Sequence, residues 1–271
     1  MNKTLLLSLC LLYFTISPAK RSFGQPPIQQ PVEAIQLFNG HNLDGWYTFL
    51  QNSGKNNDPK DVFTVNNGMI RISGEEWGSI TTLDEYKNYR LVTEFKWGEK
   101  TFEPRINKAR DCGILLHSQG EDGGSGGIWM RSIECQIIEG GTGDVIVVGD
   151  SSSNFSVTAT VASQKQDNSF VFQQGGKKET INSGRINWLK RDPEWKDTLG
   201  FRGKHDVEKP VGEWNTLECV VDGDRLTIYL NGELVNGTTN VKPQKGRIQI
   251  QSEAAEIFFR RVELTPLSPH K

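Results

Sequence analysis

Two polar side chains on one face of a strand-like segment are the first candidates for chemistry. In "RSIECQIIEGGTG", residues 131–143, a period of two puts three apolar side chains on one face and Glu134 and Gln136 on the other. An antiparallel strand often turns its polar face to solvent, so an ordinary half-exposed strand also explains the pattern. The alternative is that this face lines a cleft in which Glu134 acts as an acid or a base.

A histidine at the end of a second apolar segment is the next candidate. His117 closes "DCGILLHS" and precedes the glycine-rich "SQGEDGGSGG", and alternation places it on the same face as Asp111 and Leu115. Histidine has an unperturbed pKa close to neutrality, which suits a general acid or base. A histidine that is merely hydrogen-bonded at a sheet edge is the plainer interpretation, and the sequence leaves both open.

A third segment, "YRLVTEFKW", puts Glu94 and Lys96 on one face and apolar residues on the other. All three segments therefore combine an apolar face with a face that mixes charged and apolar residues. Such a mixed lining is typical of a ligand cleft. We expect the polar faces of three neighbouring strands to converge on one hollow, with Trp129 and Trp188 as platforms on which a sugar ring could stack, although ordinary packing also explains both tryptophans.

Short strands are the elements that must position these residues. The chain has 28 glycines but only 3 methionines, and Asp-Gly and Asn-Gly pairs at 222 and 231 are strong hairpin signals. The alternating segments suggest about ten strands with almost no helical periodicity. This pattern predicts an all-β fold, an antiparallel two-sheet sandwich of the jelly-roll type. The stretch 150–213 is more polar and irregular, and 187–206 is expected to form long loops of the kind that bind ligands.

The N-terminal segment indicates where the protein is located, and the net charge indicates which classes of partner it has. Residues 1–24 contain an apolar run too short for a bilayer, which needs about 20 residues, so we expect a cleavable signal peptide and a periplasmic or secreted protein. Residues 25–32 form a linker, and 33–267 form a single domain. Leucine before Cys10 argues against lipoprotein cleavage. The net charge of -2 favours neither nucleic acid nor a membrane surface as a partner.

Six further stretches, taken in order, carry a family resemblance: "LFNGHNLDGW" (37–46), "ARDCGILLH" (109–117), "WMRSIECQIIEGGTGD" (129–144), "EKPVGEWNTLE" (208–218), "LNGELV" (230–235) and "IQIQSEAAEIFFRRVELTPL" (248–267). Together they resemble the 3-keto-disaccharide hydrolase domain family over roughly 33–267 of the chain. That family is similar in fold to concanavalin A-like lectins and glucanases, a jelly roll with a concave carbohydrate-binding sheet.

The resemblance carries over to single residues only in part. Glu134 and Gln136 match the family's Glu-x-Gln pair. Cys112 stands where the family has serine in an Asn/Asp-Ser-Gly-Ile strand, and its parity places it toward the core. His117 stands where many members have arginine. After removal of the signal peptide three cysteines remain, and we expect them to be buried apolar groups.

The resemblance implies cleavage of a 3-keto-glycoside, in which the C3 ketone acidifies the hydrogen at C2. Elimination at C1 followed by hydration needs a base, an acid and an electrophile for the enolate oxygen. His117 and Glu134 are the catalytic candidates, in either order, and Lys96 or Arg131 could hold the enolate. No cofactor is required, although a divalent metal could replace the cation, and a partner oxidoreductase could supply the keto sugar. The other substrate-binding candidates are Glu94, Asp111, Trp129, Gln136, Trp188 and Lys209.

Two other function classes stay open. A retaining glucanase places Glu-x-Asp-x-Glu on such a strand, but here Gln136 replaces the aspartate and Glu139 has the wrong parity unless a bulge intervenes. Residues two apart on a strand lie about 6.6 Å apart, whereas a retaining pair needs carboxyls about 5–5.5 Å apart. The remaining class is a carbohydrate-binding module without catalysis.

Overall fold

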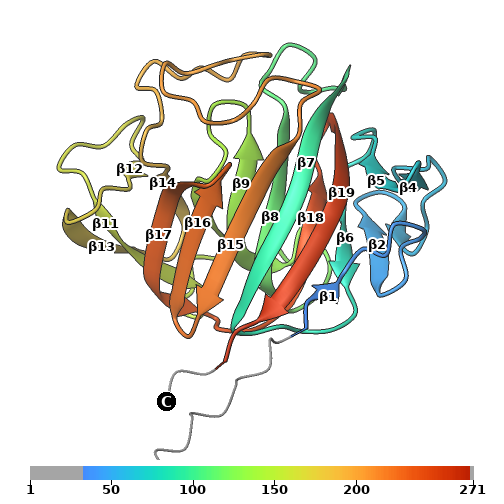
Figure 1. Ribbon diagram of the computed structural model, residues 1–271, viewed down its shortest axis with the longest axis horizontal. Helices are drawn as coiled ribbons and strands as arrows, with labels where there is room; N and C mark the ends of the chain where they lie inside the picture. The colour runs from blue at the N-terminus through green and yellow to red at the C-terminus, as the bar shows by residue number, and fades with distance from the viewer. Residues whose placement is uncertain (1–32, 269–271) are drawn as a thin grey trace, which may run out of the picture. The chain divides into compact units, whose positions relative to one another are not determined.

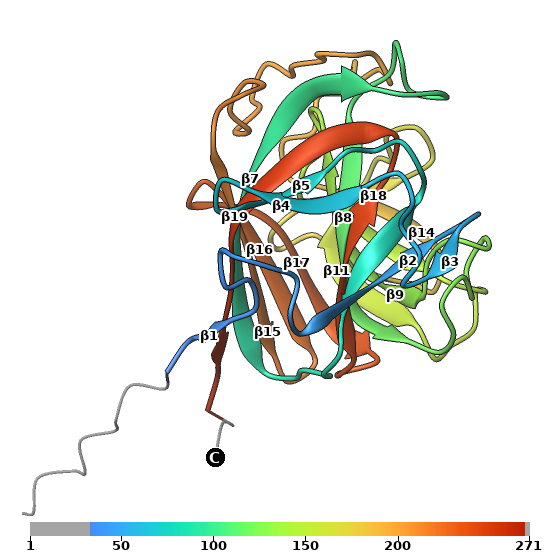
Figure 2. The same ribbon diagram turned by 90° about the vertical axis from the view of Figure 1, so that its right-hand side faces the viewer.

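Two β-sheets packed face to face make up the fold of the computed structural model, which describes residues 33–268 (Figures 1 and 2). These residues contain no α-helix, and therefore no helix that could cross a membrane. All neighbouring strands are antiparallel except β12 and β14. The predicted all-β sandwich is confirmed. The predicted signal peptide (1–24) and linker (25–32) lie outside the described residues.

The first sheet has ten strands, and its central strands lie in the foreground of Figure 1. Its order is β13 (Lys177–Ile181), β11 (Ser156–Val161), β17 (Glu233–Lys242), β16 (Arg225–Leu230), β15 (Asn215–Asp222), β7 (Tyr89–Thr101), β19 (Ala255–Pro266), β5 (Met69–Ile72) and β4 (Phe63–Asn66), with β1 (Ile35–Gln36) also paired to β19.

The second sheet has nine strands and lies behind the first in the same view. Its order is β12 (Phe170–Val171), β14 (Gly184–Asn187), β10 (Val145–Val148), β9 (Arg131–Ile138), β8 (Asp111–Gln119), β18 (Arg247–Ser252), β6 (Gly78–Thr82), β2 (Trp46–Leu50) and β3 (Gly54–Lys55).

Alternation and turn chemistry explain why these segments form strands. The apolar side chains of β9, Ile133, Cys135 and Ile137, are buried in the core between the sheets. The hairpin between β16 and β17 turns at Asn231 and Gly232, with φ of 52° and 85°. Positive φ at both central positions is what a type I′ turn requires, and Asn-Gly supplies it at little cost. The hairpins expected in 61–73 and 214–237 are both present.

Two expectations about the arrangement are wrong. The segment 150–213 is not simply irregular, because it contributes β11 to β14, although no strand interrupts 188–214. The strand around Glu94, β7, does not neighbour β8 and β9. It lies in the first sheet between β15 and β19, whereas β8 and β9 pair in the second. Alternation shows that a strand has two faces but does not identify its neighbours.

The three cysteines of the described chain, Cys112, Cys135 and Cys219, are free and buried, as expected.

Candidate active site

A row of aligned side chains crosses seven strands of the second sheet on the face that points away from the core. Residues paired across antiparallel strands share a face, and the alternate positions, such as Ile80, Ile114 and Ile133, belong to the core. Glu134 lies toward one end of this row. The row consists of Tyr47, Thr81, Gln249, Leu115, Glu134, Ile146 and Arg185.

The carboxyl group of Glu134 lies over the neighbouring strand β8 at a position that has no side chain. A Cβ on Gly113 would overlap Glu134 Oε1 and would lie 2.5 Å from Gln251 Oε1. Glycine is therefore required at this position for the carboxyl to lie beside Gln251, which hydrogen-bonds it. Glu134 is only 4% exposed. It belongs to none of the ion pairs among the described residues, so its charge has no direct partner.

A cation from outside the sheet lies over the start of β8, close to Gly113. Arg105, in the loop between β7 and β8, donates to the carboxylate of Asp111 and lies 3.8 Å from that of Glu253. It also donates to Asp197 at 3.1 Å, which ties two long loops together. Gln136 donates to the second oxygen of Asp111. Both oxygens of Asp111 are thus held in place.

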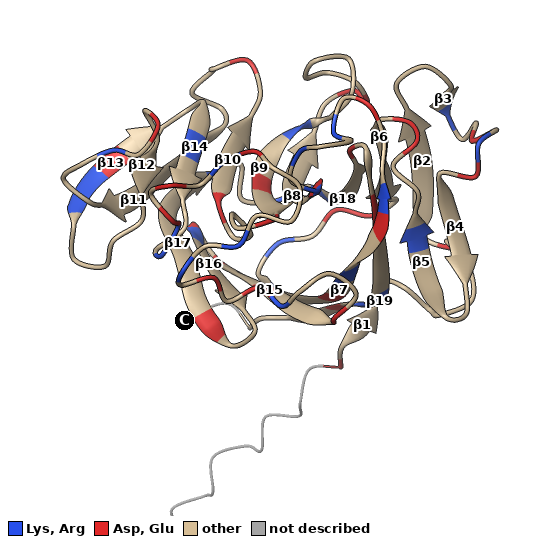
Figure 3. Cartoon of the chain, turned by 90° about the horizontal axis from the view of Figure 1, so that it is seen from above, with Lys and Arg blue, Asp and Glu red and all other residues tan. Residues whose placement is uncertain are grey.

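A second cation, Arg185, is the last side chain of the row, on β14. Arg185 lies 3.3 Å from the buried carboxylate of Asp144, to which Arg191 also donates. Viewed from above, segments of both charge signs surround β8, β9 and β18 (Figure 3). Arg185, Arg105 and Glu253 are partly exposed, whereas Glu134 below them is buried. The partly exposed charged groups therefore form a rim around the buried acid.

Burial and mutual repulsion raise the pKa of the acids in this cluster. Burial, and then the neighbouring Asp111, raise the pKa of Glu134 to about 8. Burial raises the pKa of Asp111 to about 7, against the opposing charge of Arg105. Burial, followed by Asp111 and Glu134, raises the pKa of Glu253 well above its usual value. The cluster therefore holds protonated and ionised carboxyls together near neutral pH, which suits acid–base chemistry.

The aromatic side chains lie near the opposite end of the row. Trp129 stacks on Trp77 with ring centroids 6.2 Å apart and an interplanar angle of 23°, and both rings are partly exposed. The residue after Trp129, Met130, donates its backbone N–H to Gln249 Oε1 at 3.1 Å. This contact fastens the loop that carries Trp129 onto the row. Trp129 therefore remains available as a stacking surface.

Arginine side chains lie against these acids. Within residues 33–268, no group of three or more His, Cys, Asp or Glu side chains is arranged to hold a metal ion. Asp111 is already bonded to Arg105 and Gln136, so arginine side chains supply the positive charge in this arrangement.

Glu94 and Lys96 lie elsewhere, and their expected place in the site is wrong. Both are on the outer face of the first sheet, because they alternate along β7 with Phe95 and Trp97, which belong to the core. Glu94 is paired with Arg260 at 2.5 Å, and the ammonium of Lys96 lies 5.0 Å from the ring of Trp214. A solvated outer face alternates between polar and apolar residues just as a cleft wall does.

His117 does not join Glu134 either, and its expected place in the site is wrong. A β-bulge between Leu116 and Gln119, with φ of 55° at His117, reverses the side-chain parity. The ring is 1% exposed and packs edge-on against Tyr89 of the first sheet, and its Nδ1–H donates to the Pro243 carbonyl at 2.6 Å. Burial lowers the pKa of His117 to about 4, so the enclosed ring stays neutral.

Three further candidates lie away from Glu134. Trp188 is buried, with its indole N–H donated to the Gly140 carbonyl at 3.1 Å, and cannot stack on a sugar. Arg131 is the first residue of β9, and its guanidinium lies 3.3 Å from the carboxylate of Asp150. Lys209 is exposed and lines a separate cavity. Of the predicted residues, the structure brings together Asp111, Glu134 and Gln136.

Several site residues were missed by the sequence reasoning. Gln249, Gln251 and Glu253 follow the same alternation in "IQIQSE" that singled out Glu134, so a signal for them existed. Arg105 comes from an irregular loop and Arg185 from a short edge-side strand, and no periodicity marks either residue.

Comparisons with known proteins agree with the fold and the family resemblance. The family model described as the 3-keto-alpha-glucoside-1,2-lyase-like domain matches residues 33–265. Two solved structures of candidate glycosyl hydrolases from Parabacteroides distasonis are similar. One has 17% identity and a TM-score of 0.52, covering 87% of this chain and 94% of that one, which confirms the fold. The other has 18% identity and a TM-score of 0.48, covering 87% and 100%.

A Bacillus licheniformis β-glucanase has 10% identity and a TM-score of 0.44, covering 88% of this chain and 99% of its own. No curated protein matches the sequence.

Proposed function

Because the chain belongs to the 3-keto-alpha-glucoside-1,2-lyase-like domain family, we propose that the outer face of its second sheet cleaves 3-keto-glycosides. The reaction is removal of the C2 proton, elimination at C1 and hydration of the product. One observation carries this proposal: Glu134 is a buried carboxyl without an ion-pair partner, in the middle of an otherwise hydrogen-bonded polar cluster.

Glu134 is the base. Its carboxylate takes the C2 hydrogen as a proton, and the electrons of that C–H bond form a C2=C3 enolate with the negative charge on the C3 oxygen. The C3 carbonyl then re-forms, the C2=C3 electrons move to a C1=C2 double bond, and the bond from C1 to the leaving oxygen breaks. A carboxylate with a pKa of about 8 is a much stronger base than an ordinary glutamate. Asp111 does not fit this step as well, because Arg105 and Gln136 occupy both of its oxygens.

The rim supplies the acid and the positive charge. Glu253, with its raised pKa and partial exposure, is the protonated group that delivers a proton to the leaving oxygen. Arg105 and Arg185 stabilise the enolate oxygen that develops at C3. Substrate reaches Glu134 when these rim side chains make room. Water then adds its hydroxyl group to C1 and gives its proton to the Glu253 carboxylate, and Glu134 returns its proton to C2.

The exported location and the source of the substrate complete the proposal. The apolar run within residues 1–24 supports export. A 3-keto-glycoside arises from oxidation of a sugar at C3, so an oxidoreductase acting on glycosides must precede this enzyme.

The test is an assay of the purified protein on methyl 3-keto-α-glucoside and, in parallel, on methyl α-glucoside. We expect release of methanol from the keto sugar alone, with the 1,2-unsaturated sugar as an intermediate visible by NMR. Cleavage of unoxidised β-glucans instead would favour a retaining glucanase. Sugar binding without turnover of any substrate would favour a carbohydrate-binding module.

A further inference from the structure

A stacked pair of tryptophans, Trp77 and Trp129, lies on the same outer face of the second sheet as Glu134. Trp77 directly precedes β6, and alternation gives it the face of Thr81, which belongs to the row described above. Trp129 comes from the loop between β8 and β9, and its ring lies on that of Trp77 with centroids 6.2 Å apart. Both rings are partly exposed. No step of the proposed reaction uses either tryptophan.

Trp77 is the neighbour of Glu253, the proposed acid, across two paired strands. Gly78 of β6 pairs with Ser252 of β18, so the residues one step further along, Trp77 and Glu253, stand next to each other at the ends of these strands. On its other side, Glu253 pairs with Asp111 of β8. Because neighbouring strands lie about 4.8 Å apart, Trp77 is one strand spacing away from Glu253.

The order of the strands determines the direction in which the leaving group points. The base, Glu134, belongs to β9 with its carboxyl over β8, and the acid, Glu253, follows β18. In the proposed reaction the base contacts the hydrogen on C2 and the acid contacts the oxygen on C1, so the line from C2 to that oxygen runs from β9 toward β18. The next strand along this line is β6. The group released from C1 therefore lies against Trp77 and Trp129.

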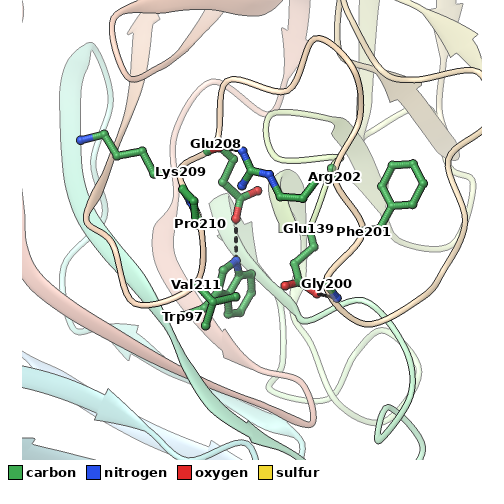
Figure 4. Close-up of a pocket in the computed structure, with 10 residues that line it drawn as sticks. Trp97, Glu139, Gly200, Phe201, Arg202, Glu208, Lys209, Pro210 and Val211 are labelled. Carbon is green, nitrogen blue, oxygen red and sulfur yellow. Dashed lines mark hydrogen bonds between the residues drawn. The ribbon is translucent and has the colours of Figure 1, made fainter.

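An enclosed cavity in another part of the molecule does not serve this purpose. Figure 4 shows this cavity, which lies between the ends of the two sheets and in which Glu208 accepts the indole N–H of Trp97 at 2.6 Å. The buried Arg110–Glu139 pair, 2.8 Å apart, separates it from the outer face that carries Glu134. A leaving group attached to a sugar at Glu134 is therefore confined to the outer face.

The polar groups next to the two tryptophans are already hydrogen-bonded to one another. Gln249 accepts the Met130 N–H at 3.1 Å, and its amide donates to the hydroxyls of Ser79 and Thr81 at 3.0 and 2.9 Å. Ser79, Thr81 and Gln249 are at most 1% exposed. A second sugar would need free partners for its hydroxyl groups, whereas an aromatic ring needs only an apolar surface such as two indoles provide. The pair therefore suits an aromatic leaving group better than a sugar.

We propose that Trp77 and Trp129 form the leaving-group subsite, and that the preferred substrates are 3-keto-glucosides of phenols, whose aromatic ring packs on the indoles. This proposal rests on the proposed function for the reaction and for the role of Glu253. It adds the chemical class of the leaving group and the two residues that select it.

The test removes one ring of the pair by Trp129→Ala. Trp214→Ala is the matched control, at a partly exposed tryptophan that lies beside Lys96 and Arg260 on the outer face of the first sheet. Both variants are assayed on phenyl and methyl 3-keto-α-glucoside, and circular dichroism verifies their folding. We expect Trp129→Ala to lower the ratio of kcat/KM for the phenyl substrate to that for the methyl substrate by about tenfold, because the aromatic ring loses its packing surface. Trp129→Phe should keep most of this ratio, and Trp214→Ala should leave it within twofold of the wild type.

An unchanged ratio in Trp129→Ala, or an equal fall in Trp214→Ala, would overturn the subsite. A fall on 3-keto-maltose as large as on the phenyl substrate would overturn the assignment to phenols. If the wild type turns over none of these keto sugars, the proposed function has failed, and calorimetric titration with unoxidised phenyl α-glucoside decides the subsite separately. Binding that Trp129→Ala weakens about tenfold and Trp214→Ala does not would support the subsite. Equal affinities, or no binding by the wild type, would overturn it.

Discussion

The outer faces of the two sheets look alike in sequence but differ in structure. On the first sheet, Glu94 is partly exposed and is paired with Arg260 at 2.5 Å and Arg261 at 3.5 Å. On the second sheet, Glu134 is buried and has no ion-pair partner. Both glutamates occupy polar positions of alternating strands. Alternation therefore identifies a polar face. Only the burial and the ion pairs of its side chains distinguish a face exposed to solvent from a face that could carry out chemistry.

The cations of the two faces differ in the same way. On the first sheet, Lys96 and Arg260 lie over the ring of Trp214, at 5.0 and 4.4 Å from its centroid, and remain open to water. On the second sheet, Arg105 reaches down from a loop to the buried Asp111. A guanidinium held against buried carboxyls lies in a region of low dielectric constant, where its electrostatic interactions are stronger than in water.

Replacing the glutamate of each face should give the largest difference. Glu134→Gln removes the proposed base, so we expect kcat/KM on the 3-keto-glucoside to fall by about 10² or more. Glu94→Gln should stay within twofold of the wild type, because Glu94 lies on the other sheet. Steady-state kinetics of both variants, with circular dichroism to verify folding, measures this. Full activity in Glu134→Gln would remove that residue from the mechanism.

Replacing one arginine on each face should give a smaller difference in activity. Arg105→Met removes the positive charge over the acid cluster, and we expect kcat/KM to fall by about tenfold or more. It should also raise the pKa of Asp111, since Arg105 is the main group that lowers it. Arg260→Met, on the exposed face, should change activity by less than twofold. pH–rate profiles of both variants give the measurement, and an unchanged profile in Arg105→Met would contradict the assignment.

The smallest effect concerns stability and its pH dependence. Folding raises the pKa of Glu134 from about 4.5 to about 8, so between these values the folded state binds the extra proton and stability falls as pH rises. Glu134→Gln removes this penalty and should raise Tm by a few degrees at pH 8, with little gain at pH 4.5. Glu94→Gln should show no such gain. Calorimetric scans at both pH values check it, and a Glu134→Gln gain that does not depend on pH would count against the raised pKa.

Much of the fold could be read from local patterns. The hairpins at 61–73 and 214–237 and the strands β8 and β9 were expected because turn residues and alternation are encoded locally. Glu134, Gln136 and Asp111 were placed correctly relative to one another, since they lie on two adjacent strands joined by a single connection. His117 was not, because one extra residue in a bulge reverses the parity and nothing in "DCGILLHS" marks where the bulge occurs.

Outside the bulged end of β8, the sequence by itself determined which side chains of β7, β8 and β9 share a face, because that depends only on the two-residue period of an extended chain. Only the tertiary structure decided which strands share a sheet and what lies over each polar face. Glu94 meets Arg260 across 166 residues of sequence, and Arg105 reaches Asp111 from a loop of no regular period. Such contacts come from packing between distant segments, for which the local pattern carries no information.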